Sequence, residues 1–597
     1  MIPELVLSKV LELSIEKGTK LLKQSDFRLA SSQKEIEESL NQHLKTVKNW
    51  AREISFKDAS QAKILPNIYI DLDLSVYPKK TLLEGFEPNE TVNFKDIPLN
   101  KHTIILGQPG AGKTTSLKYL CHSMIFEEKG IFENHEYNYP VLLKFRELDY
   151  FDSRNFLLDN LLKIFGISLK YERPNTKTEE DVSPEQYKSI AYKYVLQFID
   201  SQNLVLILDG FDELPSNEIK EYAIKDIRLL ASSMDSSLLI LSSRSSDFSY
   251  HIDGTNEFEI APLNNKQIRE FSRKWLGSKK DGVKFFKKIK KSPFYDTTIR
   301  PLTIAHLCAI YERRGDIPKK PKTVYSKLIN LLLEEWDLQR SVKRKSEYAN
   351  FEVDRKSEFL SALSFELTTH YKKNIFSSSE LQRIYHRINP EFDLPSHESR
   401  NVVKELETHN GLIMRTGYDQ FEFAHKSLQE YLTANYIVKL PELPKDLSLI
   451  KSIPNELAIA ITISSNPSMY FIKFTNEYIL APKSGMDESF VTTFINRLLL
   501  EKPDFNRTPE LVFTVLKLFE YYHTQIENLV NSKDYPNKLK LAQSLGDFCS
   551  TLINKSENFI DIIKNNYTNT SVNDDFFKYR KIHQCEGPKT VYIPKSK

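Results

Sequence analysis

The segment HTIILGQPGAGKTT, residues 102–115, constrains the fold more than any other part of the sequence. A short apolar run leads directly into the pattern G-x-x-x-x-G-K-[ST], which begins at Gly107 and ends at Thr114. Gly107, Gly110 and Gly112 let the backbone curl so that its N–H groups point inward at phosphate oxygens. Between a predicted strand and a predicted helix, this pattern indicates a phosphate-binding loop.

The residues at the end of this loop have side chains suited to a nucleoside triphosphate. Lys113 would place its ammonium group between the β- and γ-phosphates. The hydroxyl of Thr114 can ligate Mg²⁺, and Thr115 would contact the α-phosphate. Ala111 completes the loop between the glycines. The loop therefore predicts that the chain binds a nucleotide together with Mg²⁺.

Short apolar runs and helical patterns alternate along the first half of the chain. The runs that read as buried parallel strands are residues 102–107, 141–145, 204–209 and 237–244. Helical patterns follow two of them, at residues 114–127 and 218–231. This alternation predicts a doubly wound α/β domain. The polar stretch at 171–186 is expected to be a surface insertion in that domain.

A second motif, LVLILDGFDELP at residues 204–215, supplies carboxylates to the same site. Asp209 ends a predicted strand at the carboxyl edge of the sheet, where a Mg²⁺–nucleotide would bind. Asp212 or Glu213, within the next turn, could orient or deprotonate an attacking water molecule. Arg244 ends the following strand and is expected to reach a γ-phosphate.

The second half of the chain reads as mainly helical, with one pair of strands. GLIMR and QFEFA, residues 411–415 and 420–424, flank a short turn and precede a helix. Two strands joined by a turn beside helices are typical of a winged helix. The helix would carry on one face Leu428, Tyr431, Leu432 and Tyr436. His425 begins it, and from these residues alone it is a core histidine, a ligand or part of a DNA-reading helix.

The N-terminal part also reads as helical. Across residues 1–60, apolar side chains recur at helical spacing at Ile36, Leu40, Leu44, Val47 and Ile54. The simpler interpretation is a helix that packs against the rest of the protein, and the more specific one is a small effector or assembly module. His43 falls on the polar side of this helix, so we expect it to be solvated.

Composition excludes several classes of protein. The 83 basic and 80 acidic residues leave a net charge of +3, which gives no case for a dedicated nucleic-acid binder. The four cysteines include no CxxC pair, which fits a reducing cytosol rather than a disulfide framework. No apolar run approaches the roughly 20 residues that a transmembrane helix needs. We therefore expect a cytoplasmic protein without a transmembrane segment.

Three motifs in this order carry a family resemblance. ILGQPGAGKTT, ILDGFDEL and LSSRSSDF resemble the NACHT family of STAND nucleotide-binding proteins, in which a doubled acidic group follows Asp-Gly. The segment that begins IRPLTIAHLC resembles the helical region that follows NACHT, and FEFAHKSLQEYLTANYI resembles the winged-helix end. The resemblance covers roughly residues 66–440. Together with the phosphate-binding loop, it implies an α/β P-loop NTPase domain with a parallel sheet of the ASCE type.

The chain is expected to contain six regions, of which the resemblance covers the second to the fourth. They are an N-terminal helical region (1–65), a NACHT P-loop NTPase domain (66–262), a NACHT-associated helical domain (263–345), a winged-helix domain (346–440), a C-terminal helical sensor region (441–570) and a short tail (571–597).

The family resemblance also implies a switch. In it Pro301 lines the adenine pocket, and His425 contacts the β-phosphate of ADP. Exchange of ADP for ATP with its Mg²⁺ separates the domains, and protomers then assemble into a homo-oligomer. The chain most resembles bacterial NACHT proteins of antiphage defence, relatives of animal NLR receptors. The implied trigger is a phage-derived or phage-perturbed host component, and the implied ATP hydrolysis is slow and regulatory.

Two other functions remain open. One is a STAND transcription regulator whose winged helix reads DNA, although KSLQEYLTANYI carries only Lys426 as a basic residue. The other is a housekeeping ATPase with steady turnover. Rapid hydrolysis without a trigger would distinguish the housekeeping enzyme from a switch.

Overall fold

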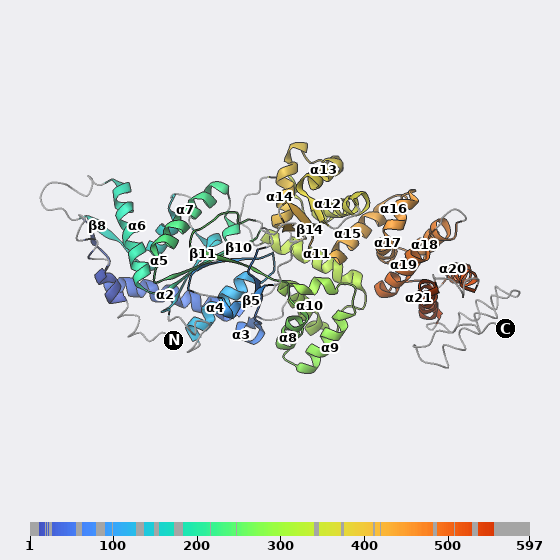
Figure 1. Cartoon of the computed structure of the whole chain (residues 1–597), viewed down its shortest axis with the longest axis horizontal. Coiled ribbons are helices and arrows are strands. Elements are labelled where there is room, and N and C mark those ends of the chain that lie inside the picture. The colour runs from blue at the N-terminus through green and yellow to red at the C-terminus, as the bar shows by residue number, and fades with distance from the viewer. Residues whose placement is uncertain are drawn as a thin grey trace.

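A computed structural model places most of the chain. The residues it describes are 11–17, 20, 22, 27–54, 62–78, 90–97, 100–126, 137–148, 154–171, 183–214, 216–245, 247–338, 346–371, 375–409, 412–417, 419–481, 486–506, 508–527 and 535–553. The predicted tail at 571–597, and most of the predicted insertion at 171–186, lie outside them. The molecule is elongated, with a sheet at one end and the C-terminal helices at the other (Figure 1). None of the described helices has the length and apolar character needed to cross a membrane.

A seven-stranded sheet organises the first half of the chain. Its strands, in the order β5-β4-β11-β6-β10-β9-β7, are β5 (Thr91–Asn93), β4 (Asp73–Ser75), β11 (Thr255–Ile260), β6 (His102–Leu106), β10 (Leu238–Ser243), β9 (Val205–Asp209) and β7 (Pro140–Lys144). The strands from β11 to β7 are parallel, whereas β4 and β5 pair antiparallel at one edge. Because β10 lies between the phosphate-loop strand β6 and the acidic strand β9, the predicted ASCE-type α/β fold is confirmed.

The strands that could be predicted from the sequence are mainly apolar, whereas β11, which was missed, contains polar residues. The four predicted strands correspond to β6, β7, β9 and β10 within one or two residues. β11 has the sequence TNEFEI, and its polar positions hid it from a search for continuous apolar runs. It joins the sheet because Phe258 and Ile260 pack into the core and Glu259 accepts a hydrogen bond from Ser245 (2.6 Å).

Helices cover both faces of the sheet because alternate strand residues point to opposite faces. The helices are α4 (Lys113–Phe126), α5 (Phe156–Phe165), α6 (Pro184–Ser201) and α7 (Asn217–Ser233). On one face Ile105 and Ile207 join the core that contains α4, and on the other Leu206 and Leu208 join the core that contains α5, α6 and α7. The two predicted helices of this domain, α4 and α7, are confirmed within two residues at either end.

The N-terminal helix α2 (Gln33–Arg52) packs onto this domain beside the edge strand β7, and its C-terminal end leads into the short strand β2 (Glu53–Ile54). Ser32 and Glu35 form a capping box at its start. The expectation that His43 is solvated is wrong: its Nε2 accepts a hydrogen bond from the backbone N–H of Leu142 in β7 (3.2 Å). Burial, with the nearby Lys144 ammonium, lowers the pKa of His43 to about 4, so the imidazole is neutral.

The middle of the chain is a helical domain followed by a winged helix. The helical domain contains α8 (Asn265–Leu276), α9 (Lys279–Lys290), the 3-10 helix η6 (Tyr295–Ile299), α10 (Pro301–Arg314) and α11 (Pro321–Leu338). The winged helix contains α12 (Val353–Glu366), β12 (Ile375–Ser377), α13 (Ser378–Ile388), α14 (Ser399–His409), β13 (Ile413–Gly417), β14 (Gln420–Phe423) and α15 (Lys426–Lys439). The predicted strand pair and its following helix are therefore confirmed, with β12 added on the other side of β14.

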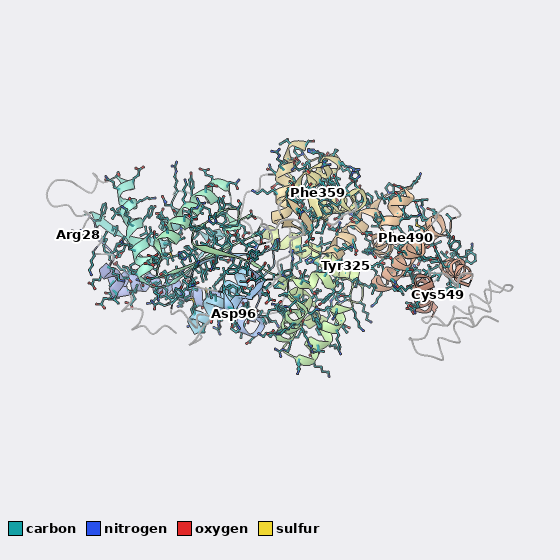
Figure 2. The ribbon with its side chains drawn as sticks, in the orientation of Figure 1. Arg28, Asp96, Tyr325, Phe359, Phe490 and Cys549 are labelled. Atoms are coloured by element: carbon teal, nitrogen blue, oxygen red, sulfur yellow. The ribbon has the colours of Figure 1, made fainter. Side chains whose placement is uncertain are left out.

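The C-terminal helices have their own core. They are α16 (Leu447–Ser452), α17 (Pro454–Ile463), α18 (Pro467–Phe474), α19 (Glu488–Glu501), α20 (Pro509–Glu527) and α21 (Tyr535–Ile553). Phe471, Phe474 and Phe494 lie at the centre of this core, which reaches the last turns of α15 through Ala434 and Ile437. The C-terminal helices are thus continuous with the winged helix, and Tyr325 of α11 lies where the parts meet (Figure 2).

Candidate functional site

The predicted phosphate-binding loop connects β6 to the first turn of α4. Gly110 has a positive φ of 68°, and a Cβ atom there would lie 2.9 Å from the Cβ of Leu302, so only glycine fits. The carbonyl of Gly110 accepts a hydrogen bond from the backbone N–H of Leu302 (3.2 Å). The loop is therefore held against the first turn of α10.

Lys113 lies beneath the loop. Its Nζ donates hydrogen bonds to the carbonyl oxygens of Gly107 (2.7 Å) and Gln108 (3.3 Å). Burial lowers the pKa of the Lys113 ammonium to about 8, against the opposing effect of the Asp212 carboxylate. A phosphate placed in the loop would stabilise the charged ammonium, so the site fits an anionic ligand.

The carboxylate at the end of β9 lies beside the hydroxyl at the start of α4. Asp209 Oδ1 accepts hydrogen bonds from Thr114 Oγ1 (3.2 Å) and Ser242 Oγ (2.6 Å). Burial raises the pKa of Asp209, because few polar groups solvate its charge. A hydroxyl and a carboxylate oxygen are ligands that Mg²⁺ prefers, so these two residues fit a metal bound with a nucleotide.

Two of the predicted catalytic residues form a buried ion pair. Arg244 Nε lies 2.7 Å from Asp212 Oδ2, and the backbone N–H of Arg244 donates to Asp212 Oδ1 (3.2 Å). Both carboxylate oxygens of Asp212 are thus engaged by the same residue. Glu213 is less buried than Asp212 and lines the same cavity. Of the two carboxylates proposed to handle water, the geometry favours Glu213.

A cavity of about 250 Å³ is lined by polar and by apolar groups. The polar lining is the loop, Thr114, Asp209, Asp212, Glu213, Ser242 and Arg244. The apolar lining is Ile54, Ile68, Tyr69, Ile70, Leu72, Phe271, Pro301 and Leu302. Apolar walls beside an anion-binding loop suit a ligand that carries both a base and phosphates.

The segment Arg300–Leu302 ties the cavity to the helical domain. Pro301 and Leu302 line the cavity. Arg300, which is buried, donates from Nη1 to the carbonyl oxygen of Pro109 in the loop (3.2 Å). Burial lowers the pKa of the Arg300 guanidinium to about 10, although the Glu422 carboxylate of β14 opposes this effect. Arg300 therefore contacts the loop while lying in the field of the winged helix.

The winged helix meets the helical domain at η6, through the start of α15. The Asp296 carboxylate accepts hydrogen bonds from the backbone N–H of Ser427 (2.9 Å) and from its Oγ (2.6 Å). These bonds cap α15 from another domain, because the side chain of His425, at the N-cap position, makes no capping bond itself.

His425 is buried and lies next to this capping contact. Its Nδ1 is 3.1 Å from the carbonyl oxygen of Asp296, so Nδ1 carries the ring proton. Burial, together with the Arg300 guanidinium, holds the pKa of His425 well below its usual value. His425 is not among the residues that line the cavity. A contact between this residue and a phosphate stays a prediction.

The structure brings most of the predicted site residues to one cavity. The lining residues predicted from sequence are Gly110, Gly112, Lys113, Thr114, Thr115, Asp209, Asp212, Glu213, Arg244 and Pro301. Gly107, Ala111 and His425 do not line the cavity, although His425 lies close enough to Arg300 for the guanidinium to lower its pKa. Ser242, Ile54, Phe271 and Arg300 were not predicted from the sequence. Ser242 stands two residues before Arg244 in the same strand end, a position that could have marked it.

Comparison with known families agrees with this geometry. A family model described as "NACHT domain" matches residues 101–279. A second, described as "Winged helix-turn-helix domain C-terminal to NACHT", matches residues 322–437. No curated protein matches the chain. The chain thus contains a NACHT P-loop NTPase domain with a winged helix after it.

Several solved structures are similar to this chain, among them three at low identity. One is a Signal Transduction ATPase with Numerous Domains (STAND) protein with a tetratricopeptide repeat sensor from Pyrococcus horikoshii, at 12% identity and a TM-score of 0.23, covering 86% of this chain and 73% of that one. Another is Cdc6p from Pyrobaculum aerophilum, at 13% identity and a TM-score of 0.22, covering 55% of this chain and 86% of that one. The third is Drosophila ORC bound to DNA, at 12% identity and a TM-score of 0.19, covering 66% and 99%.

Proposed function

We propose, from the NACHT and winged helix-turn-helix domains of this chain, that the protein is an ATP-dependent molecular switch. The observation that carries the proposal is the placement of Arg300. It contacts the phosphate loop through Pro109, it precedes the cavity residue Pro301, and it lies in the field of Glu422 and His425 of the winged helix. A change of ligand in the cavity can thus alter the contacts that hold the winged helix.

The residues of the cavity have distinct roles in this proposal. Lys113 and the loop N–H groups hold the phosphates, while Thr114 and Asp209 hold Mg²⁺. The metal would supply positive charge that neutralises the phosphate oxygens. Glu213 orients the hydrolytic water, and Arg244 leaves Asp212 to meet the γ-phosphate. Pro301 and Phe271, which both line the cavity, are the proposed contacts of the adenine base.

The two nucleotides favour different arrangements of the winged helix. With ADP bound, His425 turns from the Asp296 carbonyl toward the β-phosphate and holds the resting state. ATP favours the state in which His425 no longer touches the phosphate and the winged helix moves away. The difference in affinity between the two states sets how far the equilibrium shifts. Hydrolysis is slow because it only resets the switch.

The family resemblance extends this switch to a biological role. We propose that the protein acts in the bacterial cytoplasm, senses a phage-derived or phage-perturbed host component, and forms a homo-oligomer that triggers abortive infection. The helices α16–α21 dock on the winged helix and are the proposed sensor. Their direct contact with α15 supports this role, because a ligand bound there acts on the same helix that carries Ser427.

One set of measurements tests the switch. Purified wild type should retain ADP, exchange it slowly and oligomerise with ATP and Mg²⁺, whereas Lys113→Ala should bind neither nucleotide. His425→Ala should release ADP faster and oligomerise without a trigger. Lys45→Ala, an exposed position on α2, is the matched control. Cells that carry Lys113→Ala and survive phage challenge as well as wild type would rule out the nucleotide switch in defence.

The burial of α15 argues against the alternative function, a transcription regulator whose winged helix reads DNA. The helix proposed to read DNA, α15, is mostly buried, with Leu428, Gln429 and Glu430 all inside the protein. A recognition helix must expose side chains to base edges, so the geometry does not favour α15 in that role. Steady ATP turnover by protein purified without any trigger would instead favour the housekeeping enzyme.

A further inference from the structure

The helices α8 and α9 concentrate positive charge. Residues 264–291 contain eleven basic and two acidic residues, a net charge of +9, whereas the whole chain carries +3. The remainder of the chain is therefore net negative. Both helices lie at one margin of the molecule, on the side away from α13 and α14 (Figure 1). The net charge of the whole chain does not show this uneven distribution of charge along the sequence.

Nine of these basic side chains are exposed, on two helices that pack against each other, and they are here called the α8–α9 basic face. They are Lys266, Arg269, Arg273, Lys279, Lys280, Lys284, Lys287, Lys290 and Lys291. None of the nine forms an ion pair within the part of the chain that the structure describes. The remaining two, Lys274 and Lys288, pair with Glu270 and Asp316. Only Asp281 and Glu270 lie among these cations in sequence, so the basic face keeps a large excess of positive charge.

The two helices are packed too closely to move independently. Gly282 of α9 is buried against α8, and a Cβ atom there would lie 2.7 Å from the Cα of Arg273. Phe285 and Ile289 anchor α9 in the core on the side opposite its lysines. The basic face is therefore a fixed surface built on two helices, and not a set of side chains on a loose segment.

Helix stability explains only part of the arrangement of these lysines. Lys287 and Lys290 stand in the last turn of α9, where the helix dipole favours cations, whereas Lys279 and Lys280 stand in the first turn, where it disfavours them. Lys280 and Lys284, and likewise Lys287 and Lys291, are four residues apart, where like charges destabilise a helix by roughly 0.2–0.5 kcal/mol per pair. The repeated like-charge spacing is a local feature that opposes helix stability, as is expected at a functional surface.

We propose that the α8–α9 basic face binds the phosphate backbone of nucleic acid without reading its sequence. Seven of its nine cations are lysines, which act as point charges toward phosphates rather than as bidentate readers of bases. A lipid surface fits less well, because none of the exposed large apolar side chains of the described residues lies on α8 or α9 to enter a membrane. This partner goes beyond the proposed nucleotide switch and uses none of its phosphate-binding residues.

The test is the binding of fluorescently labelled single-stranded and duplex oligonucleotides of mixed sequence, followed by anisotropy between about 50 and 200 mM salt. Wild type should bind both, with an affinity that falls steeply as salt rises. The variant Lys280→Gln, Lys284→Gln, Lys287→Gln, Lys291→Gln should bind at least about tenfold more weakly. For duplex, a plot of the logarithm of the binding constant against the logarithm of the salt concentration should have a slope that is shallower by about 0.9 for each phosphate that the variant no longer neutralises.

A matched variant controls for overall charge. Lys45→Gln, Lys193→Gln, Lys451→Gln, Lys473→Gln removes the same charge from exposed positions on other helices and should bind like wild type. Lys113→Ala should also keep nucleic-acid binding, which separates this proposal from the nucleotide switch. Thermal unfolding should show that the basic-face variant is about as stable as wild type, because the removal of like-charge pairs offsets the loss of Lys287 from the last turn of α9.

Three results would overturn the proposal. One is the absence of salt-dependent oligonucleotide binding by wild type. Another is an equal loss of binding in the basic-face variant and the matched variant, which would mean that only total charge matters. The third is binding to phosphatidylserine vesicles without binding to oligonucleotides, which would identify a membrane surface.

Discussion

Arg497 of α19 forms a buried ion pair with Glu430 of α15, with 2.7 Å between Nη1 and Oε2. The same guanidinium donates from Nε to Glu501 Oε1 (2.9 Å) and from Nη2 to the hydroxyl of Tyr325 in α11 (3.3 Å). One side chain of the C-terminal region thus contacts both α15 and α11. Each of the helices α11, α15 and α19 is held in place partly through Arg497.

Removing this arginine should release the C-terminal helices. Arg497→Met leaves Glu430 and Glu501 buried without a counter-charge, a change that typically costs about 3–5 kcal/mol. We expect a lower unfolding temperature and faster hydrogen exchange in α15 and α19. The triple variant Arg497→Met, Glu430→Gln, Glu501→Gln should recover most of the stability. An Arg497→Met protein as stable as wild type would show that the pair contributes nothing.

Glu456 of α17, close to the same cluster, predicts a dependence on pH. Burial, and then the Glu430 carboxylate, raise the pKa of Glu456 to about 7. Between pH 4.5 and 7, Glu456 therefore stays protonated in the folded state but loses its proton in the unfolded state. The stability that this residue contributes is complete below pH 4.5 and is lost as the pH rises through 7. Glu456→Gln should be more stable than wild type at pH 8, by about 2–3 kcal/mol, and equally stable near pH 4.5. Denaturant unfolding at both pH values measures this, with exposed Glu442→Gln as control.

The protonation of His43 should make the stability of the protein depend on pH in the opposite direction. Its pKa of about 4 in the folded state lies below the ordinary value of 6.5, so the unfolded state binds the proton first as pH falls. Stability from this residue is complete above pH 6.5 and is lost toward pH 4, by up to about 3 kcal/mol. His43→Gln keeps a hydrogen-bond acceptor but cannot titrate, so it should be less acid-sensitive than wild type. Identical acid unfolding curves for the two proteins would contradict this assignment.

Arg300 should govern how long a nucleotide stays bound. Arg300→Met removes the charged hydrogen bond to the Pro109 carbonyl, worth about 1.5–3 kcal/mol, and frees the loop to open. We expect release of a fluorescent ADP analogue to accelerate by about tenfold or more in stopped-flow measurements. Arg314→Met, at the exposed end of the same helix, is the control and should release at the wild-type rate.

Asp296 should govern the first turn of α15. Asp296→Ala removes the acceptor for both groups of Ser427, and the loss of a helix cap costs about 1–2 kcal/mol. Hydrogen exchange should increase at the start of α15, while Asp296→Asn, which keeps one acceptor oxygen, should lie between the two. Asp253→Ala, at an exposed turn, should leave α15 unchanged. Protection of α15 that is unaltered in Asp296→Ala would exclude the capping role.

Site residues and strands could be predicted from the sequence where a short stretch of consecutive residues determines the local structure. Lys113 and Asp209 were found because a short motif specifies a backbone shape, and that shape fixes where the side chains lie. β11 was missed because alternating Glu and Phe do not form an apolar run. Arg300, Ile54 and Ser427 reach the site or its border only through packing between distant segments, so no local pattern marks them. His43 was misread for the same reason, since its partner is a strand 99 residues further along the chain.

The contact between His43 and Leu142 has a consequence for the sheet as a whole. β7 pairs only with β9 among the described strands, so its other side would offer open backbone groups to any extended chain nearby. The helix α2 covers this side. A fragment that begins at residue 66 would lack that cover and would be prone to aggregate edge to edge, even with its nucleotide site intact. The N-terminal helix therefore shields the sheet from other chains during any rearrangement of the domains behind it.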